Sequence, residues 1–335
     1  MMPHDEPIRL GPGPEFDLIR QFLARAGATA SPAADAVQVG PGDDCTVVDG
    51  IALSTDLSVE GIHFRREWLE PEEIGYRAAA AALSDLAAVA AQPIGVLCSL
   101  ACAGDDAAAY GPRVMDGVRS AAADVGAALL GGDLARSPGP LLLDVVAVGR
   151  TERPVLRSGA RPGDALWVTG ELGGAAAAVQ AWQRGAVPPE AARRAFARPQ
   201  PRVREALWLA ERGLAHALID LSDGLAGDAA HLAAASGVRV VLDAAAVPVH
   251  PAAARGPSGA GLRLGLAGGE DYELCFAAAD GAVEAVADEF RETFGVPIRR
   301  VGTVEAGSGV WIRDAAGRTE PLDVHAYQHF GEDTI

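Results

Sequence analysis

Aromatic side chains are scarce in this chain of 335 residues, at 5%, although hydrophobic residues make up 49%. Alanine, valine and leucine must therefore fill the core, and a chain of this length has room for about two domains. The 40 glycines and 22 prolines come without a long low-complexity run. They predict many tight turns rather than disorder.

Basic clusters are also missing. The formal net charge is −17, and no run of lysine or arginine occurs, which argues against a nucleic-acid-binding protein. Net charge alone favours a solvated acidic surface. A sharper alternative is that some carboxylates face inward and hold cations, and the positions of the acids along the chain must decide between the two.

Cysteine is rare and unpaired in the sequence. The four cysteines, none of them in a CxxC pair, are Cys45, Cys98, Cys102 and Cys275. We expect Cys98 and Cys102 to be small core residues, and the scattered pattern predicts a reducing compartment. The first residues lack the basic and apolar regions of a signal peptide, so we expect a cytoplasmic protein.

The most apolar stretch, residues 78–103, is not a convincing membrane span. It is rich in alanine and is interrupted by Asp85, Gln92 and Pro93. This pattern predicts a buried helix over 72–91 followed by a strand over 94–101. We therefore expect no membrane association.

The usual nucleotide and hydrolase motifs are absent as well. The sequence has no GxxxxGK[ST], GxGxxG, GxSxG, HExxH or EF-hand loop. The GELGG run at 170–174 follows an expected strand and precedes an expected helix, but it lacks dinucleotide-binding spacing. We interpret it as a tight turn.

Strand and helix patterns alternate in both halves of the chain, which predicts mixed α/β structure. The segment from Arg150 to Gly163 is richer in proline and glycine. We place a domain boundary there, with domains at 1–150 and 151–335.

Aspartates recur where we expect strands to end or glycine-rich turns to begin. They are Asp43, Asp44, Asp56, Asp133, Asp220 and Asp223. Asp85 joins them because it lies inside an apolar helix, where an unpaired carboxylate is costly. Any one of them is most simply a turn or capping residue. Their number, without a set of cysteine or histidine ligands, instead favours several Mg²⁺ ions around a polyphosphate over zinc.

The turns also form an ordered series of motifs. In sequence order these are GPGDD at 40–44, STDLSVEGIHF at 54–64, LSDLAAVAAQP at 83–93, GGD at 131–133, RSGARPGD at 157–164, DLSDG at 220–224, GGEDYEL at 268–274 and YQHF at 327–330. Across residues 13–331 this series resembles the thiamine-monophosphate kinase family of the aminoimidazole-ribotide synthetase superfamily.

The resemblance implies a two-domain α+β fold with mixed sheets and flanking helices. ATP and several Mg²⁺ ions would bind between the domains, and a homodimer would form mainly through strands of the N-terminal domain. The implied reaction is direct in-line transfer of a phosphoryl group from ATP to thiamine monophosphate, which yields thiamine diphosphate.

The resemblance also assigns roles to residues by position. The implied metal ligands are Asp44, Ser54, Thr55, Asp56, Asp85, Asp133, Asp220 and Asp223. The implied ATP contacts are Gly132, Arg157 and Ser222. The implied contacts to thiamine monophosphate are His63, Glu270 and Tyr327. Each has a plainer interpretation as a cap, a surface ion pair or packing.

No catalytic general base is expected. A phosphate monoester has a second pKa of about 6, so it is largely dianionic near pH 7 and already nucleophilic.

The chain departs from the family pattern at Ala82, Leu134 and Ala326. The alternatives are another ATP-using enzyme of the superfamily, of the aminoimidazole-ribotide synthetase or hydrogenase-maturation type, and a non-catalytic ATP- or metal-binding module.

Overall fold

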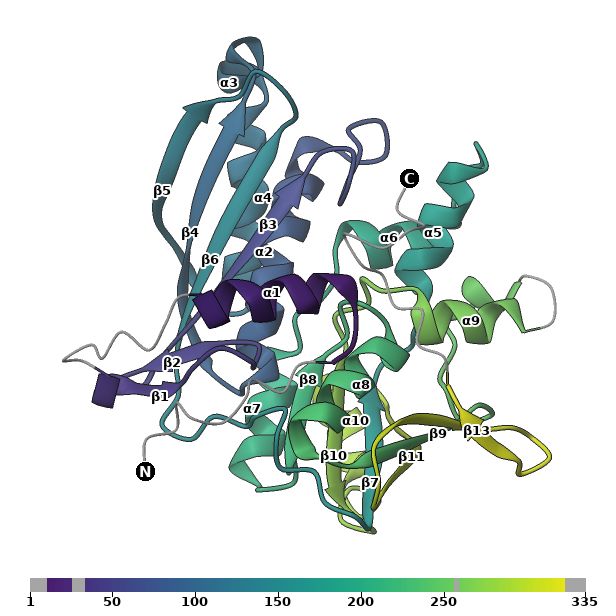
Figure 1. Cartoon of the computed structure of the whole chain (residues 1–335). Helices are drawn as coiled ribbons and strands as arrows, with labels where there is room; N and C mark the ends of the chain where they lie inside the picture. The colour runs from purple at the N-terminus through teal and green to yellow at the C-terminus, as the bar shows by residue number, and fades with distance from the viewer. Residues whose placement is uncertain (1–10, 26–33, 256–258, 323–335) are drawn as a thin grey trace.

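The computed structural model describes residues 11–25, 34–255 and 259–322, which form two mixed sheets with flanking helices (Figure 1). The first sheet has the strand order β1-β2-β3-β6-β4-β5. Its strands are β1 (Val37–Val39), β2 (Thr46–Val48), β3 (Ile51–Val59), β4 (Gln92–Cys102), β5 (Ala128–Arg136) and β6 (Leu142–Arg150). Only the β4–β5 pairing is parallel among its described neighbours, so the expected mixed sheet is confirmed.

The second sheet has the order β13-β12-β9-β11-β7-β10-β8. Its strands are β7 (Asp164–Thr169), β8 (Ala217–Asp220), β9 (Arg239–Asp243), β10 (Leu274–Ala279), β11 (Ile298–Glu305), β12 (Gly309–Arg313) and β13 (Thr319–Pro321). Strand β7 is buried along its whole length. Leu166 and Val168 belong to one core cluster, and Ala165 and Trp167 belong to another. Both faces of this sheet are therefore covered.

The described helices pack around these sheets. They are α1 (Pro14–Arg25), η2 (Ala34–Ala36), α2 (Pro71–Ala88), α3 (Gly104–Ala109), α4 (Gly111–Asp124), α5 (Gly174–Gln183), α6 (Glu190–Ala197), α7 (Val203–Glu211), α8 (Leu225–Ser236), η3 (Ala253–Arg255), α9 (Ala260–Ala267) and α10 (Ala287–Phe294). Helices α2 and α4 lie on the same face of the first sheet (Figure 1).

Helix α2 is the central helix of the molecule, and its sequence explains its start and its packing. Pro71 occupies the first turn, and the Glu73 carboxylate accepts the Glu70 backbone N–H at 2.9 Å. Gly75 and Gly117 allow close contact with α4. A Cβ at Gly75 would lie 1.8 Å from the Val114 carbonyl oxygen. Small residues thus bring the two helices together.

The two halves of the chain interlock through α5 and α6. Trp182 on α5 stacks on Trp68 of the first half, with ring centroids 5.0 Å apart. Arg193 on α6 pairs with Glu73 on α2 through two contacts of 2.8 and 2.6 Å. Phe196 belongs to the same core cluster as residues of the first sheet. The few aromatic residues are thus used partly to join the halves.

Two sequence expectations about local structure were wrong. Asp133 was expected in a turn, but Gly131, Gly132 and Asp133 lie within β5, and Asp56 lies in the middle of β3 rather than at its end. The glycines serve strand packing instead. A Cβ at Gly132 would lie 1.8 Å from the Cys98 carbonyl oxygen, so glycine lets β5 approach β4.

Other expectations are confirmed. Asp85 lies inside α2, and the apolar stretch forms a helix followed by a strand. All four cysteines are free and buried. Within the described residues, no helix combines the length and the hydropathy needed to cross a bilayer.

The segment before α1 is anchored to α8 by His231. The Gly11 N–H donates to His231 Nδ1 at 3.0 Å, and the Phe16 ring meets the imidazole edge-on at 4.2 Å between centroids. Burial, and then the charges of Arg157 and Arg20, lower the pKa of His231 to about 3. The imidazole is therefore neutral when it accepts this hydrogen bond.

We expect His231 to make the protein sensitive to acid. Unfolded histidine protonates below about pH 6.5, whereas the folded residue stays neutral down to about pH 3. Stability from this residue is therefore complete above pH 6.5. The contribution of this residue to the free energy of unfolding falls by about 1.4 kcal/mol per pH unit as the pH drops from about 6.5 toward about 3. His231→Gln should remove this slope, as measured by urea unfolding between pH 7 and pH 4. Parallel curves for the two proteins would contradict the assignment.

Candidate active site

Three carboxylates meet between the two sheets. Asp44 precedes β2, Asp85 is on α2 and Asp220 ends β8. Each offers an oxygen within 4.8 Å of the other two. Two come from the first half of the chain and one from the second. The packing of the halves therefore creates this acidic cluster, which we call the aspartate cluster.

Hydroxyl groups and one arginine oppose the charge of the cluster. The Ser54 hydroxyl donates to Asp85, and the Ser84 hydroxyl donates to Asp220 at 2.6 Å. Arg157 donates two hydrogen bonds to the Asp44 carboxylate, from Nε at 3.0 Å and from Nη2 at 2.6 Å. Three carboxylates with one paired cation leave an excess of negative charge.

The electrostatics of the cluster show this excess. Burial, and then the charge of Asp44, raise the pKa of Asp220 to about 7. Burial, and then the charges of Asp220 and Asp44, raise the pKa of Asp85 well above its usual value. Buried carboxylates without enough counter-charge are typical of functional sites.

A second group of acids extends from the cluster. Burial, followed by the charge of Asp44, raises the pKa of Asp43 to about 7, and the Asp43 carboxylate accepts the Arg157 N–H at 3.1 Å. Burial, and then the charges of Glu15 and Glu270, raise the pKa of Asp223 to about 7. Asp228 accepts the Asp223 N–H at 3.2 Å.

Comparison with known proteins agrees with this geometry. Residues 42–151 match the model for the AIR synthase related protein, N-terminal domain, and residues 161–314 match the model for its C-terminal domain. A curated thiamine-monophosphate kinase from Rhodopirellula baltica is 35% identical over 308 residues, which cover 88% of this chain and 92% of that protein. The chain belongs to the thiamine-monophosphate kinase family.

Solved structures extend the match to three dimensions. The thiamine-monophosphate kinase of Stenotrophomonas maltophilia has a TM-score of 0.72 and 34% identity, covering 89% of this chain and 96% of that one. A structure of AaThiL complexed with AMPPCP and TMP has a TM-score of 0.77 and 29% identity, covering 94% and 96%. The two-domain α+β fold expected from the family resemblance is thus confirmed.

The structure gathers some residues that the family resemblance singled out, but not all. Asp44, Ser54, Asp85 and Asp220 are brought together. The Thr55 side chain points to the other face of β3, where its hydroxyl donates to Asp144 at 2.8 Å. Neighbouring residues on a strand face opposite sides, so the Ser54 and Thr55 hydroxyls cannot both reach the cluster.

Gly132 and Asp133 lie apart from the cluster. They line a hollow of about 440 Å³ beside α4, together with Cys98, Met115 and other residues. The Asp133 carboxylate accepts the Leu134 N–H at 2.9 Å. In this single chain the GGD motif therefore belongs to the edge of the first sheet.

Three more residues expected for the family lie in turns that the structure describes. His63 Nδ1 accepts the Val59 N–H at 3.0 Å in the turn after β3. The Ser222 carbonyl accepts the Glu270 N–H at 2.7 Å, which places the two residues side by side. Tyr327 lies outside the described residues.

Several residues of the site were missed by sequence reasoning. Ser84 and Asp228 contact residues proposed from the family pattern, and Arg77 pairs with Glu270 at 2.5 Å. Asp228 carries the same signal that singled out Asp85, an acid inside an alanine-rich helix. The serine and the arginine carry no such signal, because both residue types are common on helices.

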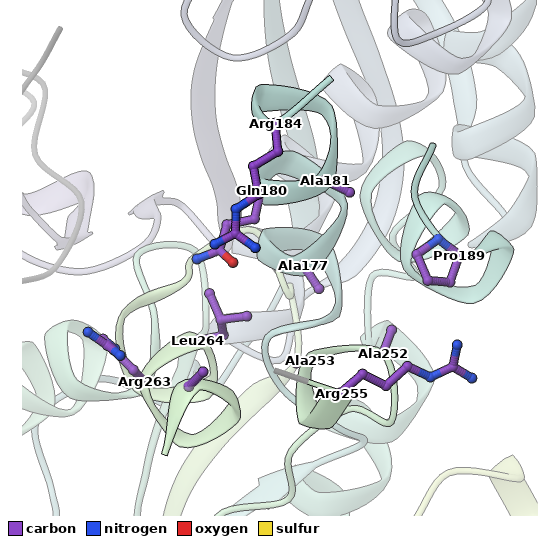
Figure 2. A pocket seen from close by; sticks show the side chains of 11 residues that line it. Ala177, Gln180, Ala181, Arg184, Pro189, Ala252, Ala253, Arg255, Arg263 and Leu264 are labelled. Carbon is purple, nitrogen blue, oxygen red and sulfur yellow. The ribbon is translucent and has the colours of Figure 1, made fainter. Parts of the chain in front are cut away.

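Another hollow, also of about 440 Å³, lies between α5, η3 and α9 (Figure 2). It is floored by alanines and bordered by Arg184, Arg255 and Arg263. The side chains of Arg255 and Arg263 point away from each other in Figure 2. None of the aspartates of the cluster lines this hollow.

We expect Asp220→Asn to stabilise the protein at pH 8 when EDTA removes divalent ions. The folded pKa of Asp220, about 7, lies above the usual value of 3.8, so this carboxyl favours the folded state below about pH 4. That contribution is lost as the pH rises through 7, at about 1.4 kcal/mol per pH unit.

The measurement is the melting temperature of both proteins at pH 5 and pH 8. The variant should melt several degrees above the wild type at pH 8, with a smaller gap at pH 5. Asp314→Asn is the control, because Asp314 only accepts backbone N–H groups and the Arg318 side chain in an exposed turn. A variant less stable than the wild type at pH 8 would contradict the repulsion argument.

Proposed function

We propose that this protein transfers a phosphoryl group from ATP directly to thiamine monophosphate and so forms thiamine diphosphate. The observation that carries the proposal is the aspartate cluster between the two halves, in a fold of the thiamine-monophosphate kinase family. The AaThiL structure, which contains AMPPCP and TMP and covers 94% of this chain, supports the choice of substrates.

The residues of the cluster fit several Mg²⁺ ions. They offer hard carboxylate and hydroxyl oxygens. The raised pKa values of Asp85 and Asp220 indicate that a bound cation would stabilise their charged forms. Asp44, Ser54, Asp85 and Asp220 would hold ions directly. Asp56 and Asp223 act on the same cluster, because the charge of Asp56 raises the pKa of Asp85 and the charge of Asp223 raises the pKa of Asp220. Bound Mg²⁺ would offset the repulsion between the reacting phosphates and stabilise charge on the transferring group.

The protein side chains then supply position rather than proton transfer. Arg157 and Ser222 would contact ATP, and Arg157 can exchange its grip on Asp44 for a phosphate because a guanidinium binds either group through two hydrogen bonds. His63, Glu270 and Tyr327 would contact thiamine monophosphate. The acceptor phosphate is already an anion near pH 7, so the residues need only align the two substrates in line.

The decisive experiment is an assay with purified protein, ATP, Mg²⁺ and thiamine monophosphate. We expect thiamine diphosphate to form, with Mg²⁺ or Mn²⁺ required and Zn²⁺ ineffective. Asp44→Asn and Asp223→Asn should each lower kcat by about a hundredfold or more, the scale of one lost electrostatic contact.

Asparagine is also a good turn residue, so it preserves the turn geometry while removing the charge. Asp314→Asn serves again as the control and should keep full activity. Full turnover in excess EDTA, or normal rates in both the Asp44 and the Asp223 variants, would refute the proposed role of the aspartates. Absence of thiamine diphosphate with an intact fold would favour another enzyme of the superfamily or a binding module.

We further propose a homodimer that forms through the open face of the first sheet. Helices cover one face of this sheet, whereas its other face exposes Leu53 and Leu57 on β3 and Leu97 on β4, the two strands that flank β6. Exposed leucines on one sheet face are typical of an interaction surface.

We also propose a cytoplasmic location. The free buried cysteines and the family's chemistry support it.

We expect light scattering at micromolar concentration to give twice the chain mass. Leu57→Glu should shift the mass toward that of one chain, because it places a charge on the open face. Val187→Glu is the matched control, since Val187 is 92% exposed and lies elsewhere. A single-chain mass for the unmodified protein would rule out the dimer at that concentration.

A further inference from the structure

Arg77 is a buried arginine that joins the two halves beside the candidate site. It lies on α2, and only 3% of it is exposed. Its Nη2 contacts Glu270 Oε2 at 2.5 Å, and its Nη1 donates to the Phe196 carbonyl at 3.0 Å. Its guanidinium carbon lies 3.9 Å from the centroid of the Phe196 ring. Contacts on three sides fix the orientation of this guanidinium.

The backbone of Glu270 is also held in a defined conformation. Its φ angle is +65°, and Tyr272 two residues later has a φ of +51°. Such angles in residues other than glycine persist only where the surroundings enforce them, and they cluster at ligand-binding turns. Here the Glu270 N–H donates to the Ser222 carbonyl, and the Tyr272 N–H donates to the Leu221 carbonyl at 2.8 Å.

The two carboxylate oxygens of Glu270 have different surroundings. Oε2 forms the ion pair with Arg77 and accepts a hydrogen bond from the Tyr272 hydroxyl at 2.8 Å. No donor among the described residues reaches Oε1. The side chain is 27% exposed, so a ligand can reach it. One oxygen is therefore used to anchor the side chain, and the other remains for a ligand.

We propose that Arg77 is a positioning residue that holds the Glu270 carboxylate for the cationic or amino-bearing rings of thiamine monophosphate. The inference rests on the proposed function, because that function makes Glu270 a substrate contact. An anchored carboxylate loses little conformational freedom when the substrate binds, which favours affinity. Because Arg77 comes from the first half and Glu270 from the second, the substrate subsite forms only when the halves are packed together.

The test is a double-mutant cycle on the Michaelis constants. Arg77→Gln should raise KM for thiamine monophosphate roughly tenfold, the scale of a lost hydrogen bond to a charged group, and change KM for ATP by less than about twofold. Glu270→Gln should do the same. The double variant should be no worse than Glu270→Gln alone, because Arg77 acts through Glu270.

A matched control separates this role from general damage to the interface. Arg193→Gln breaks a different arginine–glutamate pair between the halves, in which Arg193 contacts Glu73, four residues before Arg77 on α2. It should lower the melting temperature without changing KM for thiamine monophosphate. If it raises that constant as much as Arg77→Gln does, Arg77 has no special role.

Milder variants keep the inference testable if Arg77→Gln does not fold. Tyr272→Phe removes only the hydroxyl that donates to Glu270 Oε2. Arg77→Lys keeps the charge but loses the planar guanidinium that contacts both Glu270 and the Phe196 carbonyl. Each should raise KM for thiamine monophosphate by a few-fold and leave KM for ATP unchanged.

Unchanged constants in both milder variants, multiplicative effects in the cycle, or equal effects on the two substrates would overturn the inference. These outcomes require an active wild-type protein. An inactive wild type would instead refute the proposed function, so the two failures are distinguishable.

Discussion

Mutual repulsion within the aspartate cluster is the constraint on which the rest of the structure depends. Asp44, Asp85 and Asp220 come from three separate elements and are held within 4.8 Å of one another, although their charges oppose this. Arg157 and two serine hydroxyls offset only part of the repulsion. The rest of this unfavourable free energy must be offset by favourable packing elsewhere in the protein. Functional sites commonly lower the stability of a protein in this way.

The packing that opposes this repulsion is concentrated on α2. Its alanines and Gly75 permit close contact with α4 on one side, and its polar residues Ser84 and Asp85 face the second half on the other. The stack of Trp68 on Trp182 closes the same interface farther out. A core made mostly of small residues suits this task, because close-packed helices resist the small shifts that would relax the cluster.

The sequence alone singled out the site residues whose charge is energetically costly in their surroundings. Asp85 was identified because a carboxylate inside an apolar helix is costly, and Asp220 because it closes a buried strand. Long-range geometry could not be predicted in the same way. Glycines suggested that Asp133 lies in a turn, but they serve strand contact, and Arg77 gives no sign of its partner Glu270, almost 200 residues away. Successive side chains of β3 likewise point to opposite faces of the sheet. Thr55 and Ser54 therefore face opposite sides, although the family resemblance implies that both are metal ligands.

The choice of cations in the chain bears on how the site responds to pH. The sequence contains no lysine, so every permanent positive side chain is an arginine. Arginine does not lose its proton in proteins, whereas buried lysine readily does. Arg157 and Arg77 therefore keep their charge at every physiological pH, while the pKa of Asp220 lies at about 7 and that of Asp56 at about 6. The charge of the aspartate cluster with Arg157 therefore changes with pH through the carboxylates, and any cation that binds there must compete with protons for the same oxygens.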